Sequence, residues 1–366
     1  MKLTFRFAVV SDLHIALPHT IWDHPSRFHL VELSIPALEA VLDHLTQLDL
    51  DFLLLPGDLT QHGEPENHAW LAERLSHLPF PVYVIPGNHD VPHFVANQQS
   101  IGLHDFPRYY GKFGYENPDQ LYYTCPLLPG VRLIALNSNQ FDDEGKQVGR
   151  MDDSQIAWLK QVLHQFPQDL KLVMIHHNVV EHLPGQARHH LGRRYMLANA
   201  SALLRVLQEA GVKLVFTGHL HVQDIAQRRG VYDITTGSLV SYPHPYRVLR
   251  FTQEEGARPR LEVESHRVEA VPDWPQLQHA SREWMGDRSF GFMVKLLTHP
   301  PLNLPLAEAE RLAPDLRYFW ATIANGDGSF NFPHFPETAR RYFEGFATVD
   351  AEGNPLAIDN HTTLVL

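Results

Sequence analysis

Short apolar runs and amphipathic stretches alternate along the first 85 residues, and this alternation most constrains the fold. Apolar runs of strand length lie at residues 4–10, 51–57 and 82–88, and apolar residues at helical spacing lie between them at 32–48 and 64–78. This order predicts parallel strands joined by crossover helices. In such sheets, reactive side chains sit in the loops beyond the carboxyl ends of the strands.

The remainder of the first 270 residues adds a second group of strands. A hairpin pattern at residues 121–138 precedes an amphipathic helix at 152–166, whose leading aspartates suit a helix N-cap. Further strands are predicted at residues 171–178, 212–221, 230–238, 246–252 and 260–268. We therefore predict an α/β (α+β) fold for residues 1–270, a four-layer αββα sandwich of two mixed sheets flanked by helices.

Residues 271–366 are predicted to form a C-terminal helical extension, which begins with a proline-containing linker at 271–277. The segments "RYFW" and "FPHFP" make this extension rich in aromatic side chains. We expect it to cap a site, to supply an apolar wall for a base or acyl group, or to form a homo-oligomer interface. The alternative is an ordinary packing layer on the sandwich.

The composition argues against several classes of protein. Among 366 residues, 30 Lys and Arg face 42 Asp and Glu, and a formal net charge of −12 disfavours a broad nucleic-acid-binding surface. The single cysteine, Cys125, is expected to be a buried small side chain, and a chain without disulfides suits a reducing, cytoplasmic compartment. The sequence has no apolar run of about 18 residues that would predict a membrane span. Because Arg6 interrupts the N-terminal apolar run, that run is predicted to be a strand rather than a signal segment.

Five predicted strands end in unusual polar side chains. Taken singly, each has an ordinary explanation, because Asp often caps a helix and Gly-Asp or Gly-Asn pairs often form turns. Because all of them follow the carboxyl end of a strand, we expect them to meet at one edge of the sheets. Residues two apart in an extended segment point the same way, so each D-x-H or H-x-H pair would deliver two groups to one cavity. The set comprises Asp12, His14, Asp58, Asn88, His89, His176, His177, His219 and His221.

The chemistry of these side chains indicates a metal site. Carboxylate oxygen and imidazole nitrogen without a thiolate suit Mn²⁺, iron (Fe²⁺ or Fe³⁺) or Zn²⁺. The set is too large for one tetrahedral zinc ion. It suits two divalent transition-metal ions, about 3.5–4 Å apart, that share a bridging carboxylate.

The ordered series D-x-H, GD, GNHD, H and GHxH, spread over about residues 5 to 225, resembles the calcineurin-like metallophosphoesterase superfamily. The resemblance implies a double sheet flanked by helices and two metal ions. It implies that Asp12, His14 and His221 hold one ion, that Asn88, His176 and His219 hold the other, and that Asp58 bridges them. His177 is the alternative to His176, since a slip of one position in "IHHN" would exchange them.

The resemblance also implies a catalytic pair. His89 would face the substrate, where it can protonate the leaving group or stabilise charge in the transition state. Asp90 would orient His89 and raise its pKa; the alternative for Asp90 is a helix N-cap. His62 or His68 could approach the same pocket, or lie on a solvated helix face.

Departures from the superfamily pattern favour one branch. The stretch "GDLTQHG" has neither the arginine of serine/threonine phosphatases nor the tyrosine ligand of purple acid phosphatases. It resembles the class III branch, which comprises cyclic-nucleotide and glycerophosphodiester phosphodiesterases. We therefore expect hydrolysis of a small phosphodiester by a metal-bridging hydroxide. The alternatives are a phosphomonoesterase, a non-catalytic metal-binding scaffold, and a nuclease in which Arg193 and Arg194 form a phosphate clamp instead of a salt-bridged surface turn.

Overall fold

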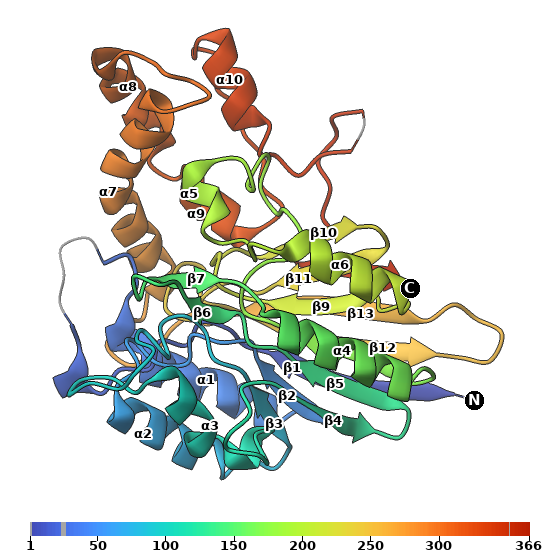
Figure 1. The fold of residues 1–366 in the computed structure, drawn as a ribbon. Coiled ribbons are helices and arrows are strands. Elements are labelled where there is room, and N and C mark those ends of the chain that lie inside the picture. The colour runs from blue at the N-terminus through green and yellow to red at the C-terminus, as the bar shows by residue number, and fades with distance from the viewer. Residues whose placement is uncertain (1, 23–26, 351) are drawn as a thin grey trace.

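Two six-stranded mixed sheets lie face to face at the centre of the computed structural model, which describes residues 2–22, 27–350 and 352–366 (Figure 1). The first sheet has the order β14-β13-β12-β1-β2-β3, with β1, β2 and β3 parallel and the other pairs antiparallel. Its strands are β1 (Leu3–Val9), β2 (Phe52–Leu55), β3 (Val82–Val84), β12 (Pro245–Gln253), β13 (Arg260–Arg267) and β14 (His361–Val365).

The second sheet has the order β10-β11-β9-β8-β5-β4. Its four central strands pair in parallel, and an antiparallel partner closes each edge. The strands are β4 (Tyr123–Leu128), β5 (Val131–Ala135), β8 (Leu170–Met174), β9 (Leu214–Thr217), β10 (Asp224–Arg228) and β11 (Val231–Thr235). A separate small ribbon consists of β6 (Asn139–Phe141) and β7 (Gln147–Gly149).

Helices cover the outer faces of both sheets (Figure 1). The helices beside the first sheet are α1 (Ser34–Thr46), α2 (Pro65–Leu75) and α3 (Phe106–Tyr109), and those beside the second are α4 (Asp153–Gln165) and α6 (Ala200–Glu209). Short 3-10 turns lie at Pro18–Thr20, Val31–Leu33, Leu103–Asp105, Gly111–Phe113 and Ala313–Leu316. The four-layer αββα prediction is confirmed.

Local sequence explains the start of α4, as predicted. The Asp152 side chain accepts a hydrogen bond from the backbone N–H of Gln155 and so caps the helix. Leu159, Val162 and Leu163 recur on one face and are buried there.

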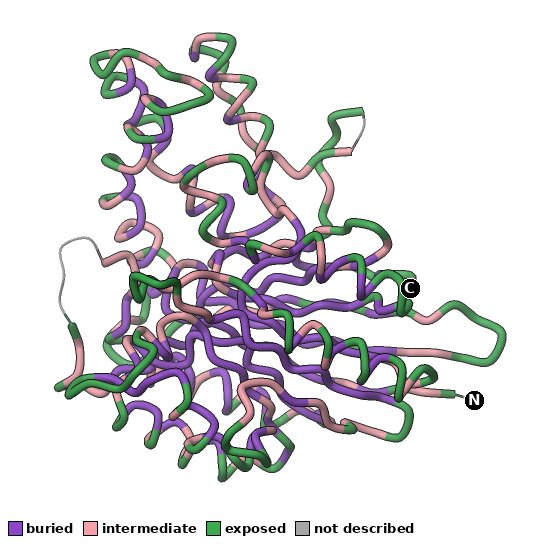
Figure 2. The backbone as a smooth tube through the Cα atoms, in the orientation of Figure 1, coloured by how far each residue is buried: buried purple, intermediate pink, exposed green. Residues whose placement is uncertain are grey.

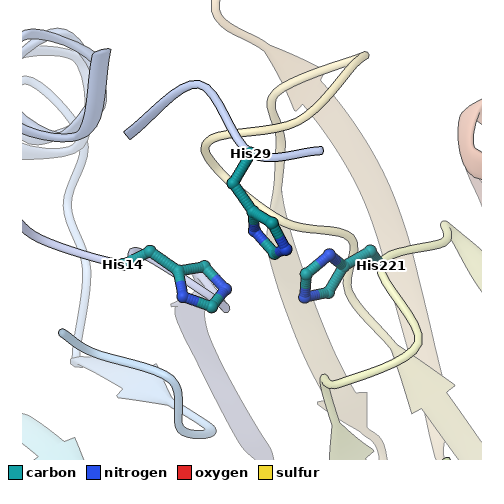
Figure 3. A group of neighbouring side chains, drawn as sticks. All are labelled: His14, His29 and His221. Carbon is teal, nitrogen blue, oxygen red and sulfur yellow. The ribbon is translucent and has the colours of Figure 1, made fainter. Parts of the chain in front are cut away.

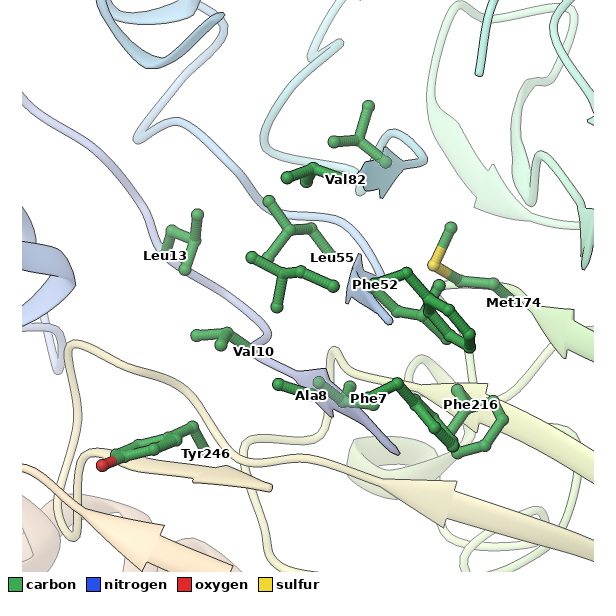
Figure 4. Packing of buried hydrophobic residues seen from close by; sticks show 14 of the residues in the cluster. Phe7, Ala8, Val10, Leu13, Phe52, Leu55, Val82, Met174, Phe216 and Tyr246 are labelled. Atoms are coloured by element: carbon green, nitrogen blue, oxygen red, sulfur yellow. The ribbon is translucent and has the colours of Figure 1, made fainter. Parts of the chain in front are cut away.

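The main core fills the space between the sheets (Figures 2 and 4). Phe7 of β1 stacks on Phe52 of β2, with 4.9 Å between ring centroids. It also meets Phe216 of β9 edge to face at 5.5 Å, which joins one sheet to the other. The strands that carry the polar loops are therefore firmly held.

The segment after residue 270 contains the predicted helices and, in addition, a closing strand that the sequence did not predict. It contains α7 (Leu277–Thr298), α8 (Leu306–Leu312), α9 (Phe319–Asn325) and α10 (Glu337–Glu344), but its last residues form β14, which pairs with β13. Its helices rise from one end of the sandwich in Figure 1 and share a hydrophobic cluster with Leu220 and Val222 of the loop after β9. Within the described part of the chain, no helix has both the length and the apolar character needed to cross a membrane.

Candidate metal centre

Loops from both sheets meet at the carboxyl ends of the parallel strands. The backbone N–H groups of Asp12 and His14 donate to the carbonyls of Gly57 (3.1 Å) and Asp58 (2.9 Å), and Gly218 N–H donates to the His176 carbonyl (3.1 Å). These bonds join the loop after β1 to that after β2, and the loop after β8 to that after β9. The backbone N–H of His219 donates to Asp12 Oδ1 at 3.1 Å and so joins the two pairs. The polar strand ends therefore do lie at one edge, as the sequence predicts.

One cluster consists of Asp12, His14, Asp58 and His221, whose candidate ligand atoms all lie within 4.8 Å of one another. His221 Nε2 is 3.0 Å from Asp12 Oδ1, and His14 Nε2 is 3.8 Å from Asp58 Oδ2. Asp12, His14 and Asp58 are at most 1% exposed.

A second cluster consists of Asp58, His176 and His219. His176 Nε2 lies 3.3 Å from Asp58 Oδ2 and 3.2 Å from Asn88 Oδ1, which brings the Asn88 amide into the same group. The His176 Nδ1 atom is held at 2.8 Å by the Pro56 carbonyl, the arrangement that orients many metal-binding histidines. Asp58 belongs to both clusters.

His177 faces a different set of atoms. Its Nδ1 atom lies 2.8 Å from Ser138 Oγ, and its ring is packed so closely against Gly149 that a methyl group there would approach within 2.4 Å. These contacts support His176 over His177 as the candidate ligand.

The residues fit divalent metal ions. Among the described residues, His14 Nε2 and Asp58 Oδ2 are buried without a hydrogen-bond partner, although such atoms are normally satisfied. Burial, followed by the charge of His29, lowers the pKa of His14 well below its usual value, so its ring is neutral and has a lone pair to offer. Burial and the charge of His177 do the same for the pKa of His219.

The paired ligands have a backbone conformation that the sequence did not predict. Asp12 and His14 have φ angles of 53° and 44°, and His219 and His221 have φ angles of 67° and 60°. The expectation that D-x-H and H-x-H point the same way because they are extended is therefore wrong. The side chains converge because the chain turns through the left-handed region at each of these residues.

Two glycines allow the close approach of these loops. A Cβ atom at Gly218 would lie 2.4 Å from Asp12 Oδ2, and one at Gly87 would lie 2.2 Å from Asp58 Oδ1. Gly218 does not have a positive φ. Its role is therefore to leave space for the neighbouring loop and not to adopt a left-handed backbone conformation.

His89 borders the same space. Its backbone N–H donates to Asp58 Oδ1 at 2.8 Å, and its Nδ1 atom lies 2.7 Å from the Gln61 carbonyl oxygen. Because a carbonyl can only accept, Nδ1 carries a proton and Nε2 is the atom left to exchange one.

Asp90 does not act as expected. Its carboxylate accepts hydrogen bonds from the backbone N–H groups of Leu59, Thr60 and Gly87 at 2.8–3.1 Å, and so ties the loop after β2 to the loop after β3. Asp90 is the last residue of a turn at 88–90, and no helix begins directly after it, so it is not an N-cap. The Gln61 carbonyl, and not Asp90, contacts the His89 ring.

His62 lines the cavity, whereas His68 lies behind it. The His62 ring stacks on His89 with 5.2 Å between centroids, and burial lowers its pKa to about 4. His68 lies fully buried behind the site, where Nδ1 meets Tyr110 Oη at 2.9 Å and Nε2 meets the Asp90 carbonyl at 3.2 Å. Neither histidine lies on a solvated helix face.

His29 is a site residue that the sequence did not reveal. Its ring lies 4.4 Å from that of His14 and 4.7 Å from that of His221, and the three imidazoles surround one space (Figure 3). Its ligand atom lies within 4.8 Å of theirs, and its Nδ1 atom is buried without a hydrogen-bond partner among the described residues. The preceding "PSRF" resembles no site motif, so no local signal could have identified it.

A cavity of about 660 Å³ opens from these side chains toward the C-terminal helices. Arg194 lines it from an exposed turn, donates to Tyr195 Oη at 2.6 Å and stacks over that ring. Among the described residues it forms no salt bridge, contrary to the alternative of a salt-bridged surface turn. Arg193 is exposed and is absent from the lining.

Cys125 lies away from the cavity and is half-buried; burial raises the pKa of its thiol to about 12, which keeps it protonated.

Comparisons with known proteins identify the family and the fold. A family model described as calcineurin-like phosphoesterase matches residues 5–223. A probable cyclic nucleotide phosphodiesterase from Synechococcus is 30% identical over 232 residues, which are 63% of this chain and 78% of that protein. A probable glycerophosphodiester phosphodiesterase from Arcobacter nitrofigilis is 30% identical over 131 residues, which are 36% of this chain and 43% of that protein, so the match spans less than half of that relative. A dimetal phosphatase from Danio rerio has the same fold, with a TM-score of 0.53 and 16% identity over 72% of this chain and 96% of that chain.

Proposed function

We propose that this chain, which belongs to the calcineurin-like phosphoesterase family, hydrolyses small phosphodiesters with the help of two divalent metal ions. The observation that carries the proposal is the shared carboxylate: Asp58 belongs to both clusters of candidate ligands. Its Oδ2 atom faces His14 at 3.8 Å and His176 at 3.3 Å, as a bridging ligand would.

The two ions, when bound, would supply an acidified water molecule and offset the charge on the phosphoryl oxygens. Asp12, His14 and His221 would hold one ion, and Asn88, His176 and His219 would hold the other. Oxygen and nitrogen donors without sulfur suit Mn²⁺, iron or Zn²⁺.

His89 would serve the leaving group. Its Nδ1–H donates to the Gln61 carbonyl, which fixes the ring and directs Nε2 as the exchangeable position. In the imidazolium form, Nε2–H can give its proton to the departing alkoxide. The backbone N–H of His89 donates to Asp58. This bond fixes the position of His89, the proposed acid, relative to Asp58, the proposed bridging ligand.

The choice of a diester over a monoester draws support from the relatives, which bear the names of cyclic nucleotide and glycerophosphodiester phosphodiesterases. That the protein is cytoplasmic and that it forms a homo-oligomer both remain predictions from the sequence.

The test is hydrolysis by metal-stripped protein reloaded with Mn²⁺, measured in parallel on an aryl diester, an aryl monoester, cyclic AMP and a glycerophosphodiester. We expect chelator-sensitive cleavage with a preference for diesters. Activity on the monoester alone would identify a phosphatase, and salt-sensitive cleavage of single-stranded DNA would favour a nuclease. Bound metal without hydrolysis of any substrate would favour the scaffold.

A matched pair of variants tests the bridge. Asp58→Asn is expected to lose metal and most of its activity, since it removes charge from both clusters. Asp49→Asn makes the same change at an exposed position in the loop between α1 and β2 and is expected to leave both unchanged. Full metal occupancy in Asp58→Asn would contradict the bridging role.

A further inference from the structure

The cavity beside the candidate metal centre has two unlike halves. At one end it is lined by His14, Asp58, Asn88 and the other candidate site residues. At the other end the lining comes from the C-terminal extension and consists of apolar and aromatic side chains. That lining, which we call the apolar wall, includes Met285, Phe292, Leu296, Phe319, Trp320 and Phe346.

The apolar wall is packed onto the ligand loop. Leu220, which lies between His219 and His221, is 1% exposed and belongs to the same hydrophobic cluster as Leu296 and Phe319. Phe292 and Trp320 meet edge to face at 5.8 Å, so the rings hold one another in place. The wall is thus a fixed surface that continues directly from the candidate metal centre.

Among the polar side chains that line the cavity, two glutamines are already engaged, whereas Arg194 adds a cation and His189 Nε2 is buried without a hydrogen-bond partner among the described residues. Gln186 Oε1 accepts from the backbone N–H of His182 at 2.8 Å, and Gln186 Nε2 donates to Asn178 Oδ1. Gln147 Nε2 donates to the carbonyls of Asn88 and Val91. Of the six side chains named for the apolar wall, Trp320 alone carries a nitrogen, and Tyr342, which also lines the cavity, adds one hydroxyl.

These features discriminate between substrate groups. Recognition of a nucleobase requires hydrogen-bonding groups directed at its edge, and recognition of a polyphosphate requires several cations. A hydrocarbon chain requires only apolar contact area in a water-excluding cavity. Because the wall supplies apolar area and few polar atoms, it suits the third kind of group.

We propose that the substrate is a phosphodiester in which one alcohol carries a hydrocarbon chain, and that this chain lies along the apolar wall while the phosphate faces the metal centre. The proposal rests on the proposed function, whose substrate class it narrows. The wall lies in residues 285–346, outside the 5–223 that match the family model, so it is a feature of this chain's own C-terminal region.

The test is a series of p-nitrophenyl alkyl phosphodiesters with methyl, butyl and octyl chains, used below the concentrations at which they form micelles. For the full-length, Mn²⁺-loaded protein we expect kcat/KM to rise roughly twofold to fourfold for each methylene that is buried. Phe292→Ala and, independently, Trp320→Ala are expected to reduce the octyl-to-methyl ratio at least fivefold. Phe290→Ala, an exposed phenylalanine on the same helix, is the matched control and should keep the ratio.

A binding measurement makes the outcome independent of turnover. In calorimetry with the metal-loaded protein, octyl phosphate should bind more tightly than ethyl phosphate, and Phe292→Ala should remove most of the difference.

The possible failures are distinguishable. Metal-dependent cleavage with no dependence on chain length, or a preference for a nucleoside diester over the octyl diester, would overturn the inference and leave the proposed function intact. If no diester is cleaved, the proposed function fails, and equal binding of octyl and ethyl phosphate would then overturn the inference as well.

Discussion

At the scale of single residues, backbone conformation marks the candidate centre. Asp12, His14, Asp58, His219 and His221 all have positive φ angles, a conformation that costs a residue other than glycine about 1–3 kcal/mol. Asp and His tolerate this region better than most residues, but such strain persists only where the surroundings impose it. Its concentration at candidate ligands supports a functional reason for the geometry.

His89→Ala tests the division between metal ligands and acid. We expect the variant to retain its metal ions, because the backbone N–H that reaches Asp58 remains, and to lose about 10²–10⁴-fold in kcat. The loss should be larger for an alkyl leaving group than for p-nitrophenolate, which needs no proton. Metal analysis and kinetics on both substrates provide the check, with exposed His93→Ala as the control. Loss of metal would identify His89 as a ligand.

At the scale of elements, buried ionisable side chains join the loops that carry the site. Asp90 links the loops after β2 and β3. His182, after β8, lies between Asp224 of β10, at 2.5 Å, and Asp233 of β11, at 3.4 Å. Asp233 also accepts from the backbone N–H groups of Val179 and Val180, which directly follow the "IHHN" segment.

The raised pKa of buried His182 implies that the stability of the protein depends on pH. Burial alone would lower its pKa, but the charge of Asp233 and the hydrogen bonds to Asp224 and Asp233 raise it from 6.5 to about 10. A raised pKa means that the folded state holds the proton more tightly. The stabilisation is therefore fully present below pH 6.5 and is lost as the pH rises through about 10.

Replacing this histidine should show the effect. His182→Gln is expected to lower the free energy of unfolding at pH 6 by about 3–5 kcal/mol, because two carboxylates lose their buried partner. It should also flatten the decline of stability between pH 7 and pH 10, measured by denaturant titration at each pH. Exposed His77→Gln is the control. An undiminished pH dependence in His182→Gln would mean that another group causes it.

At the scale of the whole molecule, the C-terminal strand returns the chain to the first sheet. The chain leaves the sandwich at α7 and returns as β14, which pairs with β13 at the edge of the first sheet. The fully buried guanidinium of Arg247 donates to the Asp359 carbonyl just before β14, to Ser265 Oγ and to the Thr235 carbonyl. The extension is thus attached at both of its ends.

Removal of residues 358–366 should therefore lower the Tm. The truncated chain would expose the edge of β13 and leave part of a buried arginine without its acceptor, a loss of about 1–3 kcal/mol for that group alone. Thermal unfolding of the truncated and full chains measures the difference. Val365→Thr, at an exposed position within β14, is expected to change the stability by no more than about 0.5 kcal/mol. An equal Tm for the truncated chain would show that β14 is dispensable.

Periodicity in the sequence determined the strands and helices of the sandwich, because burial on one face imposes a repeat that can be read locally. The polar ends of those strands identified the candidate ligands, since parallel strands must deliver their carboxyl ends to one edge. The sequence did not predict the strand β14, because "HTTLV" buries only Leu364 and so has no clear alternation of apolar and polar residues.

Only the tertiary structure decided the partners of Asp90, the entry of His29 and His62 into the site, and the apolar wall beside it. His29 meets His221 across 192 positions of sequence, and Phe292 lies on a cavity whose other side begins at His14. Such meetings depend on how whole elements pack, and no local pattern records them. The sequence thus determined which chemical groups stand at the ends of the strands, and packing decided what surrounds them.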